Sequence, residues 1–213
     1  MKIVIFGATG IAGRAILKES LKQGFDVVVL TRDKNKITIK DSHLTVIEGD
    51  VTNPSTVYEI VTGADAVIQS LGIGGKGNGK PTIFVSQTNK LIMAQMKQAG
   101  IKRFVAISAL GAGNSIAFLP RIFTCFILPC FMKWYKVILD DKNRLEADIM
   151  NSGLDWVIVR SAGLNEKSAK GTIKATLDGK GIKTTITADD MAHFVVNQIT
   201  DNTYIKQAPT ISN

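Results

Sequence analysis

The chain has 213 residues, of which 45% are hydrophobic and 21% charged, as expected for a globular protein with a well-filled core. We expect one domain over residues 1–213. The formal net charge of +8 raises the question of nucleic acid, but no run of Lys and Arg exceeds two residues. A basic protein that holds the phosphates of a cofactor needs no second anionic partner, so we expect no nucleic-acid partner.

The chain begins with MKIVIF, a short apolar run with no basic lead region before it and no small-residue cleavage site beyond it. We interpret this run as a first strand and not as a signal peptide. We therefore expect a cytoplasmic protein.

Apolar, β-branched runs then alternate with longer segments of helical periodicity. The predicted strands occupy residues 2–6, 27–30, 44–47, 66–68, 103–107 and 156–159, and the predicted helices 11–23, 54–62, 83–99 and about 133–151. This alternation predicts an α/β fold of the Rossmann type, a doubly wound parallel sheet with helices on both faces. A strand-like run at 172–177 and a helix at 191–199, begun by a capping-box-like Thr187, predict a small C-terminal extension on the substrate side.

Three glycines in G-x-x-G-x-x-G spacing, Gly7, Gly10 and Gly13, follow the first predicted strand and begin the first predicted helix. Such glycines permit a tight turn and let a diphosphate approach the backbone, while the helix N-terminus offers unpaired N–H groups to the anion. In this context the spacing predicts a dinucleotide-binding turn. A turn that only caps the helix would not need three glycines.

The end of the second strand indicates which dinucleotide binds. An acid there would accept hydrogen bonds from the ribose of NAD, whereas an arginine pairs with the 2′-phosphate of NADP. The chain has Thr31-Arg32-Asp33 at this point, with Lys34 and Lys36 just beyond. We therefore predict NADP(H) rather than NAD(H). In the alternative, Asp33 turns inward and Arg32 is only a surface residue.

A second glycine-rich stretch, residues 74–79 followed by Lys80, matches the start of a nucleotide triphosphatase loop. The next residue should be Ser or Thr to hold magnesium, and it is Pro81. We therefore expect a mobile loop near the cofactor and no triphosphatase.

Further motifs follow along the chain: Gly49-Asp50-Val51, Ser70-Leu71-Gly72, Ile107-Ser108-Ala109, residues 152–160, 176–181 and 190–194. With the glycine turn and Arg32, they make nearly the whole chain resemble the atypical short-chain dehydrogenases/reductases. Within that group the chain is similar to the NAD(P)H-binding proteins related to biliverdin-IXβ reductase, also called flavin reductase, and more distantly to NmrA-type proteins.

The resemblance implies site roles position by position. It assigns the diphosphate to Gly7, Thr9, Gly10 and Gly13, the 2′-phosphate to Arg32 and Lys36, the adenine to Asp50 and Val51, and the phosphate and ribose side to Gly72 and Ser86. Ile11 and Leu71 are further predicted cofactor-binding residues. Ser108 and Lys142 would contact the nicotinamide end of the cofactor, and we predict catalytic roles for them. The alternatives are a serine that caps the strand end and a surface lysine paired with Glu146.

Two departures from the flavin reductases fall on the acceptor side. Gly163 stands where they have a pocket histidine, and residues 111–132 form a longer insert. The insert is too short and too interrupted to span a membrane, which takes about 20 residues. Because ligands bind beyond the carboxyl ends of parallel strands, we hypothesise an apolar lid whose Phe118, Phe123 and Phe126 stack on a flat acceptor. A homodimer contact and an interfacial membrane anchor are the alternatives.

The insert also contains Cys125 and Cys130, the two cysteines of the chain. Their spacing matches neither a zinc pair nor a redox C-x-x-C motif. We predict two reduced, buried thiols and no metal site.

The stretch KWYKVILDDK, residues 133–142, contains a tyrosine and a lysine that call for comparison with the usual short-chain dehydrogenases. In those enzymes a lysine one helical turn after the tyrosine lowers the tyrosine pKa and holds the nicotinamide ribose. Here Ile138 stands four residues before Lys142, and Leu139 stands four residues after Tyr135. The tyrosine acid is therefore absent.

Hydride transfer to a conjugated acceptor needs no such acid, because the acceptor delocalises the incoming charge and takes its proton from solvent. We therefore expect an NADPH-dependent reductase of a flat acceptor: a flavin, a quinone or a linear tetrapyrrole. The main alternative is a non-enzymatic NADP(H)-binding regulator that senses redox state. A lesser alternative is an epimerase or dehydratase of nucleotide sugars.

Overall fold

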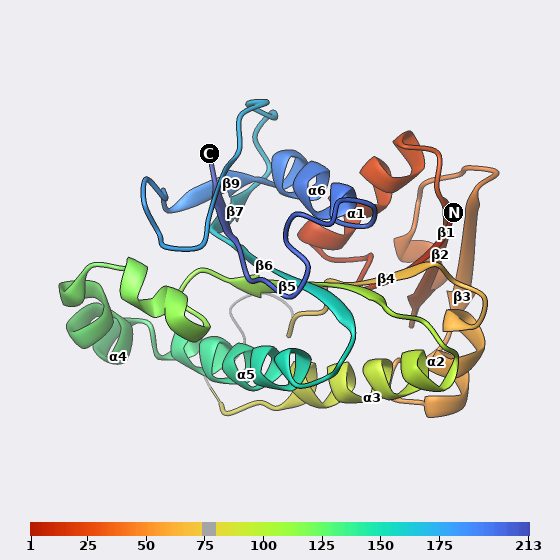
Figure 1. Ribbon diagram of the computed structural model, residues 1–213, viewed down its shortest axis with the longest axis horizontal. Coiled ribbons are helices and arrows are strands. Elements are labelled where there is room, and N and C mark those ends of the chain that lie inside the picture. Colours follow the sequence, from red (N-terminus) through yellow and green to blue (C-terminus); the bar gives the residue numbers. More distant parts are fainter. Residues whose placement is uncertain (74–79) are drawn as a thin grey trace.

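The computed structural model describes residues 1–73 and 80–213, which form a sheet with helices on both faces (Figure 1). The strands are β1 (Lys2–Phe6), β2 (Asp26–Thr31), β3 (Leu44–Glu48), β4 (Ala66–Gln69), β5 (Arg103–Ala109), β6 (Asp155–Ser161), β7 (Gly163–Asn165), β8 (Lys174–Thr176), β9 (Thr185–Thr187) and β10 (Thr210–Ser212). In the main sheet their order is β3-β2-β1-β4-β5-β6-β10-β8, and only β8 runs antiparallel to its neighbour. Strands β7 and β9 pair separately.

The helices cover the sheet from both sides. They are α1 (Ile11–Lys22), α2 (Pro54–Val61), α3 (Phe84–Gln98), α4 (Leu128–Phe131), α5 (Lys133–Met150) and α6 (Ala188–Asn197). Figure 1 shows α1 and α6 on one face of the sheet and α2, α3 and α5 on the other. The predicted doubly wound parallel sheet is therefore confirmed. That residues 1–213 form one domain remains our proposal.

Two hydrophobic clusters, one on each face of the sheet, explain why the inner strands are apolar along most of their length. Side chains alternate between the faces along a strand. Ile3 therefore packs with Ile16 of α1, while its neighbour Val4 packs into the cluster that contains Met96 and Leu145. Because helices cover both faces, the inner strands β1, β4, β5 and β6 are almost entirely buried, whereas the edge strand β3 exposes Thr45 and Glu48.

The strand order reverses direction between β1 and β4, and this reversal locates the site. The chain moves outward from β1 to β2 and β3, then returns to β4 on the other side of β1. The loops that follow β1 and β4 therefore leave the sheet in opposite directions and open a crevice at the carboxyl edge, where ligands of this fold bind.

The C-terminal part differs in detail from the prediction. The strand expected at 172–177 is shortened to β8, and the structure adds β7, β9 and β10, which the sequence pattern did not indicate. The expected cap is present, because the Thr187 hydroxyl accepts a hydrogen bond from the N–H of Asp190 at 3.2 Å. The helix therefore begins at Ala188, three residues before the predicted start.

The insert between β5 and α5 consists of short turns of helix. A 3-10 segment η2 (Gly113–Phe118) is followed by a π-helical turn η3 (Phe123–Ile127) and by α4. These segments extend beyond the carboxyl ends of the strands, at the left of Figure 1. Within residues 1–73 and 80–213, no helix is long and apolar enough to cross a membrane. The glycine-rich stretch 74–79 lies outside the described residues, so its predicted place near the cofactor stays a prediction.

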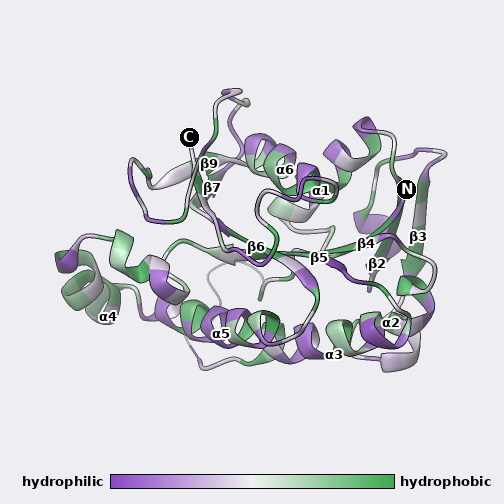
Figure 2. Cartoon of the chain, viewed as in Figure 1, coloured by the Kyte–Doolittle hydropathy of each residue, from purple (hydrophilic) through white to green (hydrophobic). Residues whose placement is uncertain are grey.

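The prediction that Cys125 and Cys130 are buried is wrong. Both thiols are free, as expected, but both are exposed. The apolar sequence around them suggested burial, yet this short helical segment packs only one of its faces on the protein. Figure 2 shows how hydrophobic residues continue along this projecting segment.

Candidate functional site

The glycine turn after β1 lies in close contact with the loop after β4. Gly7 has a φ of +90°, and a Cβ added there would lie 2.7 Å from the carbonyl carbon of Ser70. The Ser70 hydroxyl donates to the carbonyl oxygen of Phe6 at 2.9 Å, which fixes the two loops together. A side chain at position 7 would force these loops apart, so glycine is required for the crevice to form.

The first helix presents an open N-terminus at this turn. Gly10 is its N-cap and provides no side-chain cap, and no acidic residue occupies the first turn. A Cβ added to Gly13 would overlap the carbonyl oxygen of Gly7, so the helix packs directly on the turn. The first N–H groups and the positive end of the helix dipole are therefore available to an anion such as a diphosphate. Thr9 and Ile11, the other residues predicted here, lie in the same turn.

The ends of β2 and β3 bring the predicted adenosine residues together. Arg32 and Asp50 are exposed and close enough that the Arg32 charge contributes to a lowered Asp50 pKa, after hydrogen bonds from the backbone N–H and hydroxyl of Thr52. Asp33 accepts the N–H of Asn35 at 3.0 Å and caps the short helix η1 (Lys34–Lys36). Its carboxylate is thus used within the loop, while Arg32 and Lys36 extend to solvent.

Lys142 of α5 is buried at the carboxyl ends of β4 and β5. Its ammonium donates to the carbonyl oxygen of Ile107 at 2.7 Å and to that of Leu71 at 3.4 Å. Burial lowers the pKa of this ammonium to about 8, although the nearby carboxylates of Asp141 and Glu146 oppose the shift. Lys142 is therefore neither a surface residue nor paired with Glu146, and one of its three N–H groups remains for another acceptor.

Ser108 lies at the end of β5, directly after the carbonyl that Lys142 holds. The side chain is buried, and its hydroxyl oxygen finds no hydrogen-bond partner among the described residues. A buried polar atom without a partner is unusual, and it indicates an acceptor or donor that the protein does not itself supply. The serine is therefore free to bond to a ligand, whereas a serine that capped the strand end would have a backbone partner.

The hydroxyl of Tyr135 is already in use. It donates to the carbonyl oxygen of Leu110 at 2.8 Å, and burial raises its pKa. Its ring packs with Phe123 and Met132 beside the buried cluster of the insert. The interpretation of Tyr135 as a packing residue is thus supported, and Ile138 stands one turn before Lys142 as the sequence requires.

Near Lys142, one side chain differs from the sequence-based expectation and another carried none. Ser86 was expected to line the phosphate and ribose side, but its hydroxyl donates to the carboxylate of Asp141 at 2.5 Å, and its backbone N–H also contacts that carboxylate. Gln69, at the end of β4, is fully buried, and neither atom of its amide finds a hydrogen-bond partner among the described residues. The sequence reasoning missed Gln69; a polar residue that ends an otherwise apolar strand was the available signal.

The predicted acceptor residues do not share one environment. Phe118 is half-buried and lies against Gly179, and Phe123 is half-buried against the cluster of Leu128 and Leu139. Phe126 is 57% exposed, on the outer side of the insert. Gly163 is exposed in β7, and its N–H donates a hydrogen bond to the carbonyl oxygen of Thr184 at 2.9 Å.

The insert is tied to the sheet by a buried ion pair. Arg160 of β6 and Glu146 of α5 are each 2% exposed, with 2.7 Å between their nearest charged atoms. Arg160 also donates to Asn114, and Gly113 packs so closely on the pair that a Cβ there would overlap it. Glu146, the alternative partner for Lys142, is therefore committed to Arg160.

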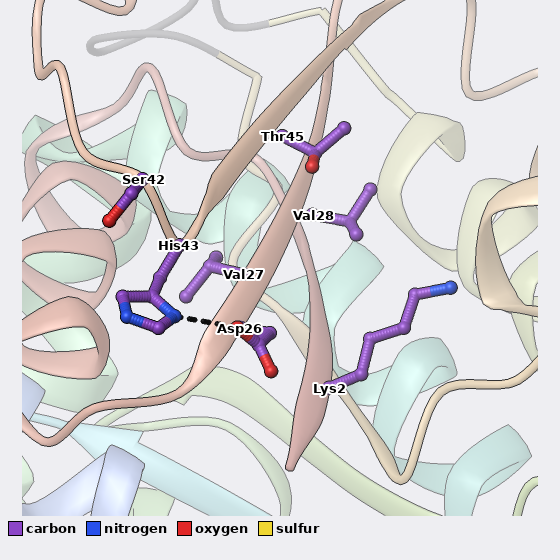
Figure 3. A pocket seen from close by; sticks show the side chains of 7 residues that line it. All are labelled: Lys2, Asp26, Val27, Val28, Ser42, His43 and Thr45. Carbon is purple, nitrogen blue, oxygen red and sulfur yellow. Dashed lines mark hydrogen bonds and ion pairs between the residues drawn. The ribbon is translucent and has the colours of Figure 1, made fainter.

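Two hollows on the surface of the described residues lie at different distances from the glycine turn. The larger, about 360 Å³, is lined by Lys2, Asp26 and His43 at the amino ends of β1 and β2, and His43 Nδ1 lies 2.7 Å from Asp26 (Figure 3). It is on the edge opposite the glycine turn, where this fold binds no dinucleotide. The second, about 250 Å³, adjoins the site, because Ile11 and Arg14 of α1 contribute to it.

The fold and the turn define a dinucleotide-binding protein, and comparison with known proteins agrees. A family model described as NAD(P)H-binding matches residues 7–202, so the chain belongs to this NAD(P)H-binding family. This finding supports the resemblance to atypical short-chain dehydrogenases/reductases.

Individual relatives are distant. UPF0659 protein YMR090W of Saccharomyces cerevisiae is 28% identical over 100% of this chain and 93% of its own length. The divinyl chlorophyllide a 8-vinyl-reductase of Arabidopsis thaliana is 25% identical, but the alignment covers 84% of this chain and only 43% of that protein. A short-chain dehydrogenase/reductase from Veillonella parvula, solved in complex with NADP, has a TM-score of 0.80 at 17% identity and covers 100% of this chain and 94% of that one.

Proposed function

We propose that the protein is an NADPH-dependent reductase that transfers hydride to a flat conjugated acceptor without a tyrosine general acid. The observation that carries the proposal is the arrangement around β5. Lys142 is buried at the carboxyl end of the strand, Ser108 has an unsatisfied hydroxyl there, and the Tyr135 hydroxyl is bonded to Leu110. The site thus has groups to hold a nicotinamide but no phenol to protonate an alkoxide.

The chain's own residues fit a dinucleotide. The close approach at Gly7 and Gly13 and the uncapped helix N-terminus provide a cradle for a diphosphate. The residues to which we assign cofactor binding are Gly7, Thr9, Gly10, Ile11, Gly13, Arg32, Lys36, Asp50, Val51, Leu71, Gly72, Ser86, Ser108 and Lys142. For Ser86 we propose a role through its backbone position, because its hydroxyl bonds to Asp141.

The choice of NADP(H) over NAD(H) follows from the loop after β2. An acid that bonds the two ribose hydroxyls would select NAD, but the carboxylate of Asp33 caps η1. Arg32 and Lys36 instead offer positive charge to a 2′-phosphate. The NADP-bound V. parvula structure shows that a protein of this fold can hold this dinucleotide.

A reduced nicotinamide, when bound, supplies the hydride. The remaining task of the protein is to orient the reactants and to exclude water from the crevice. We propose that Ser108 and Lys142 orient the cofactor and the acceptor at the end of β5, and that the inner face of the insert, with Phe118 and Phe123, covers the acceptor. We propose that Gly163 of β7 also borders the acceptor, and Phe126 would join only if the insert closed.

The acceptor class rests on chemistry and on one relative. A flavin, a quinone or a tetrapyrrole delocalises the incoming charge and takes its proton from solvent, so the missing tyrosine is no obstacle. The reductase relative from Arabidopsis is named for a chlorophyllide, itself a conjugated ring system. We also propose that the protein acts in the cytoplasm, with which its two free thiols are compatible.

The test is direct. Purified protein is incubated with NADPH and, separately, with FMN, a water-soluble quinone and biliverdin, and the loss of nicotinamide absorbance is followed. Saturable turnover with at least one acceptor is expected, and it should fall in Ser108→Ala. NADPH binding without turnover of any acceptor would overturn the reductase proposal.

That negative outcome would favour a second candidate, a non-enzymatic NADP(H)-binding redox sensor. The specific observation in its favour is that Ile138, and not a tyrosine, stands one helical turn before Lys142, while the Tyr135 hydroxyl is bonded to Leu110. The resemblance to flavin reductases adds that Gly163 stands where those proteins have a pocket histidine. A sensor should show a change in proteolysis or in partner binding between NADPH and NADP⁺ at equal saturation.

A further inference from the structure

The outer face of the insert, defined here as Ile122, Phe126 and Phe131, is an exposed apolar surface. These side chains are 68%, 57% and 71% exposed, respectively. The rings of Phe126 and Phe131 contact each other edge to face, with centroids 5.8 Å apart, although η3 and α4 are separate segments. Three large apolar groups held together at the end of the molecule form a patch, unlike single hydrophobic residues scattered over a surface.

The opposite side of the insert explains why this patch cannot turn inward. Leu128 is buried against Leu139 of α5 and Ala112, and Phe123 and Met132 pack on this cluster. The ion pair of Arg160 and Glu146 holds the start of the insert through Asn114. The inner face is therefore fixed by packing, and the outer face is left to solvent.

The charged residues that flank the patch in the sequence are all cationic. Arg121 and Lys133, both exposed, stand directly before Ile122 and two residues after Phe131. The whole stretch between Asp65 and Asp140 contains Lys and Arg but neither Asp nor Glu. Lys136, the next cation along α5, pairs with Asp140 at 2.9 Å. An anionic partner is thus favoured at the patch and a cationic one is repelled.

We propose that the outer face of the insert docks into the interfacial layer of a membrane that contains anionic lipid. Exposed aromatic and aliphatic side chains ringed by Lys and Arg are the features that bind proteins at this depth, with the apolar groups in the acyl boundary and the cations among the headgroups. Trp134 and Tyr135, whose rings lie 5.5 Å apart, follow the patch in the chain at the start of α5.

A second copy of the chain fits this surface less well. In a twofold contact Arg121 and Lys133 would approach the same cations of the partner. A stable protein interface also takes about 20–30 residues a side, whereas this patch centres on three. A membrane that contains anionic lipid avoids both problems. It supplies negative charge to Arg121 and Lys133, and it needs no surface of matching shape.

The two cysteines allow the proposal to be tested on the insert itself. Cys125 and Cys130 are the only cysteines of the chain, and both are free and exposed. In the full-length Cys125→Ser protein, an environment-sensitive fluorophore attached to Cys130 reports the surroundings of α4. Vesicles of phosphatidylcholine with about 30 mol% phosphatidylserine should shift its emission to the blue and carry the protein down on sedimentation. Phosphatidylcholine vesicles should do neither.

Matched variants assign the binding to the patch. Phe126→Ser/Phe131→Ser should weaken vesicle binding at least about tenfold, because two apolar anchors are lost. Arg121→Gln/Lys133→Gln should remove the preference for anionic vesicles. Met150→Ser, which changes an apolar residue of similar exposure at the other end of α5, should bind as the unmodified protein does. Circular dichroism checks that each variant is folded.

Equal binding to both kinds of vesicle, or binding to neither, would overturn the proposal. So would a dimer on size-exclusion chromatography that Phe126→Ser/Phe131→Ser dissolves, because this outcome would assign the patch to a second copy of the chain. These experiments use no cofactor, so their result is independent of whether the protein is a reductase.

Discussion

The ammonium nitrogen of Lys142 lies 2.7 Å from the carbonyl oxygen of Ile107, where β5 reaches the carboxyl edge of the sheet. The next residue, Ser108, has a buried hydroxyl without a partner among the described residues. A charged donor from α5 and a free hydroxyl of β5 thus lie at successive residues of that strand, at the edge where a nicotinamide would bind.

The burial of Lys142 should make stability depend on pH. Its pKa is about 8 in the folded protein and 10.5 as an ordinary lysine, because burial disfavours the charged form. The unfolded chain therefore binds more protons between these values. This lysine raises the free energy of unfolding by up to about 3 kcal/mol as the pH rises from about 8 to about 10.5. The same increase is lost as the pH falls from about 10.5 to about 8, and below about 8 no further change is expected from this group.

Lys142→Met should remove this dependence, since methionine fills a similar volume and does not titrate. Urea unfolding of both proteins at pH about 7 and about 10 measures it. The exposed Lys97→Met, in α3, is the control and should keep the slope of the unmodified protein. The same slope in Lys142→Met as in the unmodified protein would contradict the assignment of the pKa.

Arg32→Ala should change cofactor preference. Loss of a charge-assisted contact to the 2′-phosphate should raise the Kd for NADPH about tenfold or more and leave that for NADH nearly unchanged. Calorimetric titration with each dinucleotide measures both constants. Lys40→Ala, which removes an exposed charge further along the same loop, should affect neither. An equal loss for both dinucleotides would argue against a 2′-phosphate contact.

Gly13→Ala should damage both the turn and cofactor binding. The added Cβ would overlap the carbonyl oxygen of Gly7, so the helix must move, at a cost of about 1–3 kcal/mol in the free energy of unfolding. At Gly10 the nearest atom to an added Cβ is 3.7 Å away, so Gly10→Ala should fold nearly normally. Thermal unfolding with and without NADPH compares them, and a Gly13→Ala protein as stable as Gly10→Ala would contradict the packing.

Tyr135→Phe should leave catalysis intact. The lost hydrogen bond to Leu110 should lower the free energy of unfolding by about 1 kcal/mol, because the carbonyl loses its buried donor. Turnover with the best acceptor should stay within about twofold of the unmodified protein, a difference of under half a kcal/mol. A turnover several hundredfold lower in Tyr135→Phe would instead indicate that this tyrosine acts as a general acid, and it would contradict our interpretation of α5.

Much of the cofactor side was predictable because its signals are local. The run Lys2–Phe6, the glycines that follow it and the periodicity of α1 lie within one continuous stretch, and the structure places them as predicted. The order of strands and helices was likewise predictable, because each element is recognised from the hydrophobic periodicity of its own residues. The short strands β7, β9 and β10 were missed, because three residues carry too little pattern to identify a strand.

Contacts between distant residues were not predictable. Ser86 bonds to Asp141 and Glu146 pairs with Arg160, and no periodicity connects either pair. The same limit led to the error at Cys125 and Cys130, since an apolar sequence does not say which of its faces meets the protein.

The sequence by itself determined an alternating α/β chain with a dinucleotide-binding turn and without a tyrosine one helical turn before Lys142, because each of these depends on residues close together in the chain. The tertiary structure alone decided that Lys142 is buried against Ile107 and Leu71, that Ser108 lacks a partner, and that Phe126 and Phe131 face outward. Burial and hydrogen bonding are properties of neighbours in space, and only the packing of α5 and the insert on the sheet sets those neighbours.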